Sequence, residues 1–266
     1  MTTTNPPGVT FGRVMRSEWV KFRSLTSTSV TITAAVAGMV GLGWLTCALY
    51  ADRWPQLTEQ TRERLEPTAL SLQGYALVQL AFGVLGVLVV SGEYSTGQIR
   101  STFSAVPART PVLLAKAAVF AAVTLVVGEL AAFAAFLGGQ AFLSSQDIET
   151  TLAAPGVLRA VSGTGLYLTG IGLLGVAFGW LVRYTAGAIA GLVALVLIVP
   201  GLAGTLLPQS WAPYVVPYLP STAGQALLAV RPQPLSLPPW TGFAWFCGYV
   251  VVALAAAAVV LKRRDA

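Results

Sequence analysis

The residues best suited to chemistry in this sequence are collected in one polar connection between two long apolar runs. The connection reads SGEYSTGQIRSTFSAVPARTPVLLAK and spans residues 91–116. The sequence contains no histidine, which excludes histidine general bases and histidine-based metal sites. The carboxylate of the connection can instead pair with a basic partner or bond its own backbone. The ionisable side chains of the connection are Glu93, Arg100, Arg109 and Lys116.

Elsewhere the sequence carries no enzymatic signature. It has no G-x-x-x-x-G-K-[ST] phosphate-binding loop, no Cys/His metal pattern and no glycine-rich dinucleotide turn. We therefore predict that the chain is not an enzyme, has no ATPase site of its own and binds no cofactor. The formal net charge of +6 does not indicate nucleic-acid binding, because the basic residues are distributed as a membrane orientation signal.

The composition is that of a membrane protein. Hydrophobic residues make up 55% of the chain and charged residues only 10%, whereas soluble domains carry roughly 25% charged residues. The apolar runs approach the ~20 residues that a helix needs to cross a bilayer. The sequence predicts an all-α polytopic protein with six transmembrane helices, over about residues 30–50, 75–91, 112–135, 157–182, 187–207 and 240–261.

Basic residues set the predicted orientation. With both termini in the cytoplasm, the inner segments hold eleven arginines and lysines and the outer segments five. The positive-inside rule therefore favours cytoplasmic N and C termini. We expect a multi-pass protein of the plasma membrane in this orientation.

An amphipathic helix is predicted ahead of the first span. In FGRVMRSEWVKFRSL, apolar residues recur at helical spacing on one side, while basic and hydroxyl residues take the other. A basic amphipathic helix with aromatic residues lies in the membrane interface. We expect residues 1–28 to form a disordered start and this helix, and residues 29–266 to form the transmembrane domain. The expected apolar side comprises Phe11, Val14, Met15, Trp19 and Phe22, and the other side comprises Arg13, Ser17, Lys21 and Ser24. Arg16 belongs to the same predicted interfacial helix.

Two outer connections have distinct patterns. The segment LTEQTRERL, residues 57–65, predicts a short exposed helix. Residues 208–239 contain eight prolines, which forbid a continuous helix, yet the segment is too apolar for a solvated linker. We expect short broken helices there, at the outer face of the bundle.

Glu129 is the ionisable residue that lies deep in a predicted span. A charge at that depth costs at least a few kcal/mol, so the side chain should face the bundle interior or a wet cavity. Two interpretations stay open for it. Glu129 either lines a pathway or responds to protons, or it joins two helices as a protonated or hydrogen-bonded acid.

Small residues in the spans concern packing. The G-x-x-x-G patterns at Gly175–Gly179 and Gly187–Gly191 indicate close helix packing or dimerisation. Cys47 and Cys247 are compatible with a disulfide, but burial as two small hydrophobic residues is favoured.

Within the polar connection, residues 95–107 predict a short amphipathic helix. Ile99, Thr102, Phe103 and Val106 fall on one side, and Pro107 ends the helix. Such a helix at the membrane face suits a groove on a cytosolic partner. An ordinary loop whose cations reach toward the lipid headgroups is the alternative.

The connection resembles the cytoplasmic loop of ABC-2-type transporter permeases. Those permeases commonly show a G-E-x-x-x-G-[TQ]-[IL]-[KR] segment, then a proline, an arginine and a lysine that enters the third helix. The opening RSEWVKFRSLTST is similar to the family's interfacial elbow helix, and six spans in this order complete the pattern. The matching positions are Gly92, Glu93, Gly97, Gln98, Ile99, Arg100, Pro107, Arg109 and Lys116.

The resemblance implies a membrane subunit that works as a dimer with a second permease copy, identical or related. Separate cytosolic ABC ATPase subunits would bind the ATP and Mg²⁺, and membrane lipids would surround the helices. Residues 93–109 would form the coupling helix that seats in the ATPase, and residues 208–239 would be the family's broken extracellular helices. The implied coupling residues are Glu93, Tyr94, Gly97, Gln98, Ile99, Arg100, Phe103, Pro107 and Arg109.

Three functions compete at this point. The leading one is the permease subunit of an ATP-driven exporter that moves a substrate outward across the plasma membrane. The second is a stand-alone secondary transporter or channel that uses Glu129. The third is a membrane anchor that recruits an ATPase for signalling, and it requires the same docking helix as the first.

Overall fold

The computed structural model describes residues 10–24 and 26–263, and within these ranges every regular element is a helix. The predicted disordered start lies outside the described residues. Six helical segments are long and apolar enough to cross a membrane, which agrees with the predicted number. They are Ser27–Gln56, Pro67–Ser95, Arg109–Gln146, Val157–Val182, Thr185–Leu206 and Pro239–Arg263.

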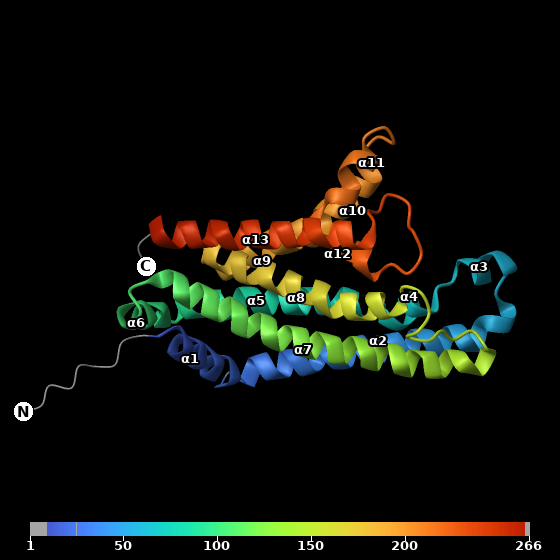
Figure 1. The fold of residues 1–266 in the computed structure, drawn as a ribbon, viewed down its shortest axis with the longest axis horizontal. Coiled ribbons are helices and arrows are strands. Elements are labelled where there is room, and N and C mark those ends of the chain that lie inside the picture. The colour runs from blue at the N-terminus through green and yellow to red at the C-terminus, as the bar shows by residue number, and fades with distance from the viewer. Residues whose placement is uncertain (1–9, 25, 264–266) are drawn as a thin grey trace, which may run out of the picture.

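The helices run roughly side by side in one elongated bundle (Figure 1). The long ones are α2 (Thr26–Arg53), α5 (Tyr75–Ser95), α7 (Arg109–Leu143), α8 (Val157–Val182) and α13 (Pro239–Arg263). The short ones are α1 (Phe11–Ser24), α3 (Glu59–Arg64), α4 (Pro67–Leu72), α6 (Gln98–Ala105), α9 (Thr185–Val193), α10 (Val199–Leu206), α11 (Ala212–Val215) and α12 (Pro220–Gln225).

Helix α8 occupies the centre of the bundle and packs against α5, α7 and α13. Glycines allow the closest approach, because a Cβ atom at Gly175 would overlap the backbone carbonyl of Gly83 on α5. A Cβ at Gly179 would meet the Val87 carbonyl at 3.0 Å. The first G-x-x-x-G pattern therefore serves helix packing inside the chain, as small residues do at helix crossings in membranes.

The beginning of α1 and the last turn of α13 lie at one end of the bundle, together with α6 (Figure 1). We call this the termini end, defined by α1, α6 and the last turn of α13. A buried apolar cluster joins six helices there, through residues such as Phe22 of α1, Phe103 of α6 and Leu261 of α13. Helix α6 is thereby packed onto the bundle rather than extended away from it.

The opposite end of the bundle carries residues 57–65 and 208–239, the two connections that the sequence analysis singled out. Helix α3 is exposed, as LTEQTRERL predicts. Residues 208–239 form α11, α12 and two 3₁₀ turns, Val216–Tyr218 and Ala226–Leu228, which confirms broken helices. Arg159 of α8 holds this segment by donating to the carbonyl oxygens of Leu227 and Ala229, at 2.8 and 2.9 Å.

The fifth span is interrupted. A π-helical turn, Ala194–Ile198, separates α9 from α10, and Pro200 follows in the first turn of α10. A proline lacks the backbone N–H that would close a regular turn, which accounts for a break at this place. Helix α10 leans away from the bundle (Figure 1), and it exposes the apolar residues Val199, Leu202 and Leu206.

Both cysteines are free thiols, so no disulfide joins Cys47 to Cys247. Cys47 is buried, with its sulfur 3.3 Å from the Ser71 hydroxyl oxygen. The expectation that both are buried is wrong for Cys247, which lies on the exposed side of α13.

Candidate functional site

The polar connection folds as predicted into a short helix, α6, between α5 and α7. Gly97 joins α5 to α6 with φ +72°, a left-handed conformation that glycine adopts without steric cost. Val106 ends α6, and Pro107 directly follows it. The chain then enters α7 at Arg109.

The apolar side of α6 faces the bundle, so it is not available to a separate partner. Ile99 and Phe103 are both buried within this chain. In this conformation Ile99 and Phe103 cannot themselves fill a groove on a cytosolic protein, and the docking of the short helix on such a partner stays a prediction. The residues that α6 and its flanks expose are Gly97, Gln98, Arg100, Ser101, Ser104, Ala105, Pro107 and Ala108.

Aromatic rings hold α6 against α8. Phe103 stacks on Trp180 with ring centroids 6.3 Å apart, and Tyr94 meets the same indole edge-on at 5.9 Å. Two arginines make cation–π contacts with these rings. The guanidinium carbon of Arg109 lies 5.3 Å from the ring centroid of Phe103, and that of Arg183 lies 5.1 Å from the ring centroid of Tyr94. Arg109 also donates to the Leu261 carbonyl at 3.2 Å, which links α7 to α13.

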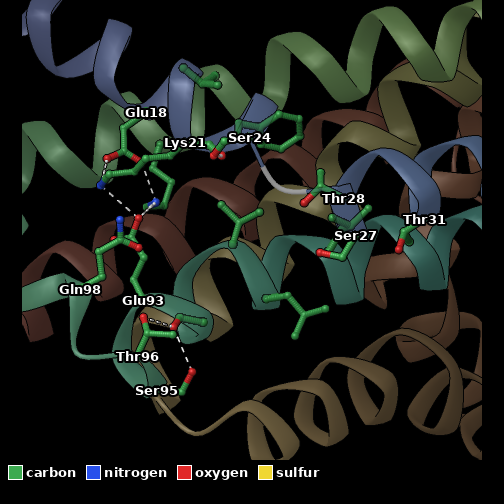
Figure 2. Close-up of a pocket in the computed structure, with 17 residues that line it drawn as sticks. Glu18, Lys21, Ser24, Ser27, Thr28, Thr31, Glu93, Ser95, Thr96 and Gln98 are labelled. Atoms are coloured by element: carbon green, nitrogen blue, oxygen red, sulfur yellow. Dashed lines mark hydrogen bonds and ion pairs between the residues drawn. The ribbon is translucent and has the colours of Figure 1, made fainter.

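A buried charge cluster ties the same region together from the other side (Figure 2). It comprises Glu18, Lys21, Glu93 and Lys116, from α1, α5 and α7. Lys116 Nζ lies 2.6 Å from Glu18 Oε2 and 2.8 Å from Glu93 Oε1. Lys21 Nζ lies 2.8 Å from Glu18 Oε1 and 3.1 Å from Glu93 Oε1. Lys21 also donates to the Thr102 hydroxyl of α6 at 3.1 Å, so the cluster reaches the short helix as well.

Three of the four side chains of the cluster are almost fully buried, and that of Lys21 is 23% exposed. The side chains of Lys116 and Glu18 are each 3% exposed and that of Glu93 is 9% exposed. For Lys21, burial acts to lower the pKa, but hydrogen bonds and charge attraction from Glu18 and Glu93 outweigh it and raise the pKa above 10.5. Lys21 therefore stays protonated throughout the physiological pH range.

Glu18 is the member of the cluster that sequence reasoning missed. It lies on the predicted apolar side of α1, between the buried residues Val14 and Phe22. The i, i+4 spacing of these three residues, with Lys21 three positions after Glu18, was the available signal. For the other residues of α1, Phe22 of the predicted apolar side is buried, whereas Trp19 of the same side is exposed. Arg13 and Arg16 are also exposed.

Glu129 lies apart from this region, in the middle of α7. Its side chain is partly buried and packs on Gly165 of α8, where a Cβ atom would lie 2.6 Å from the carboxyl carbon. This contact places the carboxyl group between two helices. Both interpretations of Glu129 remain open on this geometry.

We expect Gly97→Ala to loosen α6. An alanine in the left-handed region costs about 1 kcal/mol. Gly97 adopts this conformation at the start of α6, so the substitution destabilises the packed position of α6 by about that amount. Amide hydrogen exchange within α6 should become about fivefold faster. Gly92→Ala is the control, because a Cβ at Gly92 meets no atom within 4 Å and should leave exchange unchanged. Equal rates in all three proteins would show that Gly97 does not set the seating of α6.

Neither protein-family models nor curated protein sequences give a match to this chain.

Proposed function

We propose that this chain is the membrane subunit of an ATP-driven exporter, similar to the ABC-2-type permeases, and that separate cytosolic ATPases power it. The observation that carries the proposal is the way in which α6 packs: one of its sides is buried against the bundle and the other is exposed. This short helix is anchored to the bundle through its buried side, and its other side presents an exposed polar surface at the termini end. A docking helix that transmits movement requires both properties.

The two anchors of α6 support a coupling role. Ring stacking joins Phe103 to Trp180 of α8, and the Thr102 hydroxyl joins α6 to Lys21 of α1. A partner that pushes on the exposed side of α6 would therefore move α1, α5, α7 and α8 together, since packed elements shift as units. In this proposal Ile99 and Phe103 transmit the movement, and Gln98, Arg100 and Ser104 contact the ATPase.

Exposed apolar surfaces support assembly with a second permease copy. Helix α2 and the α9–α10 segment leave much of their apolar surface uncovered by this chain, for example at Leu45, Leu49 and Leu202. Both surfaces belong to membrane-crossing segments, so lipid or another copy covers them. We propose that a second copy covers part of them and that substrate passes outward between the copies.

Reversing the charge of the exposed side of α6 tests the docking role. In Arg100→Glu/Ser104→Glu, two carboxylates replace a cation and a hydroxyl that both lie on the surface. We expect roughly tenfold less P-loop ATPase to co-purify with this variant than with wild type, because a charge mismatch at an interface opposes association. The measurement is a pull-down from native membranes in mild detergent, with mass spectrometry of the bound proteins.

Arg16→Glu is the matched control for this test. It reverses one exposed charge at the same end of the bundle, but on α1 rather than α6, and it should retain the ATPase. Substitutions at Ile99 or Phe103 are less informative, because both side chains are buried and their loss would unseat α6. Intact chain without any ATPase, in wild type and variants alike, would contradict the proposal and favour a stand-alone transporter that uses Glu129.

A further inference from the structure

The exposed surface around α11 carries aromatic side chains and no charge. Residues 184–230, which include α9, α10, α11 and α12, contain no aspartate, glutamate, lysine or arginine. Trp211 directly precedes α11 and is 65% exposed, and Tyr214 within α11 is 79% exposed. Soluble domains carry roughly 25% charged residues, most of them on the surface. The surface around α11 is therefore not one that suits contact with bulk water.

The exposed residues surround most of α11. Ala212 is buried, whereas Trp211, Pro213, Tyr214 and Val215 are exposed. Successive residues of a helix are about 100° apart, so these four side chains point in different directions and do not form a single face. A protein partner covers one face of a helix, whereas a fluid medium covers every exposed side. Lipid fits this distribution better than a second protein surface does.

Helix α11 lies beside the bundle, near the level at which α13 begins (Figure 1). It follows α10, which leans away from the other helices. The turn after α11 contacts α13, because Tyr218 meets Trp245 edge-on with ring centroids 5.5 Å apart. Tyr249 also donates its hydroxyl hydrogen to the Tyr218 carbonyl oxygen at 2.9 Å. The exposed surface around α11 is thus continuous with that of α13, a helix long and apolar enough to cross a membrane.

The backbone of α11 restricts the depth at which it can lie. A single helical turn leaves most of its N–H and C=O groups without partners inside the helix, and such groups are too costly to leave unpaired in the hydrocarbon region. Prolines at positions 208, 213, 217 and 220 reduce the number of free donors, because proline has no N–H. The remaining groups require water, which the headgroup region supplies. Tryptophan and tyrosine prefer the same region, since each combines an apolar ring with a polar N–H or O–H group.

We propose that α11 and its flanking turns, residues 208–218, bind the lipid headgroup region at the end of the bundle opposite the termini end. Trp211 and Tyr214 insert their rings between lipid molecules, and the exposed Trp240 at the beginning of α13 belongs to the same aromatic belt. This contact anchors the end of α10 that a π-helical turn separates from α9. The inference does not rest on the transport function, and it stands if no ATPase docks on α6.

Depth-dependent fluorescence quenching in phosphatidylcholine vesicles tests the proposal. The full chain, with both native cysteines replaced by alanine, would carry Tyr214→Cys labelled with a nitrobenzoxadiazole fluorophore. Three quenchers would be compared: iodide in water, a phosphatidylcholine with a nitroxide near its headgroup, and one with a nitroxide deep in its acyl chain. We expect the shallow nitroxide to quench about fivefold more strongly than iodide, because the label lies among headgroups rather than in water. It should also quench more strongly than the deep nitroxide.

Two further label positions calibrate this measurement. Gln60→Cys lies on the exposed helix α3 at the same end of the bundle, and iodide should quench its label most. Val252→Cys lies on the exposed side of α13, midway along the helix, and the deep nitroxide should quench its label most. A label at position 214 that behaves like either of these would overturn the proposal. Protection of that label from all three quenchers would overturn it as well, because a protein surface would then cover α11.

Discussion

Lys116→Met should lower the free energy of unfolding by about 3–5 kcal/mol, the range measured when one partner of a buried ion pair is removed. Lys116 is buried and lies within 2.8 Å of carboxylate oxygens of both Glu18 and Glu93. Methionine fills a similar volume but carries no charge. The two carboxylates would then share Lys21 alone, in a region from which water is largely excluded.

Denaturant unfolding of the purified chain in detergent would measure this loss. Lys262→Met makes the same substitution at the same end of the bundle, but at an exposed position on α13. Surface substitutions of this kind usually change stability by less than about 0.5 kcal/mol. Similar stabilities for the two variants would show that Lys116 is not held in a buried ion pair.

A double variant separates loss of charge from loss of packing. Lys116→Met combined with Glu18→Gln removes one positive and one negative charge, so it restores the balance between Lys21 and Glu93. We expect it to be less destabilised than the sum of the two single variants, because the groups are in direct contact. Additive effects would mean that the two charges do not stabilise each other.

The membrane-crossing helices were predictable because hydropathy alone selects them. The fourth span matches its prediction at both ends, Val157–Val182. The third extends further than predicted, since α7 runs to Leu143 rather than ending near residue 135. Tertiary contacts stabilise this extension, and a hydropathy pattern does not predict such contacts. Gln140 donates to the Ser71 hydroxyl at 2.8 Å and accepts from the Thr150 amide at 2.8 Å.

The orientation of amphipathic helices was less predictable. Spacing correctly placed Ile99 and Phe103 on one side of α6, but it does not say whether that side meets the same chain or a partner. The same limit applies to α1, where Glu18 lies on the buried side. The burial of the Glu18 carboxylate among apolar residues is explained only by its ion pair with Lys116. The two residues are far apart in the sequence. Long-range pairing of this kind leaves no local pattern.

Gly175→Val should disrupt the central helix pair, at a cost of about 3 kcal/mol or more. A Cβ atom at Gly175 would overlap the backbone carbonyl of Gly83, and a backbone atom has no alternative rotamer that would relieve the overlap. Helices α5 and α8 would have to separate along their contact. Unfolding in detergent would measure the destabilisation, and Gly175→Ala should have a smaller effect in the same direction.

Gly248→Val is the matched control, because a Cβ at Gly248 on α13 meets no atom within 4 Å. Equal stability of the two valine variants would contradict the close approach of α5 and α8. The contact also matters for the site, since α5 carries Glu93 and Tyr94 while α8 carries Trp180. A wider gap between these helices separates the ring contacts from the charge cluster. Gly175→Val should therefore also accelerate hydrogen exchange in α6, although α6 itself is unaltered.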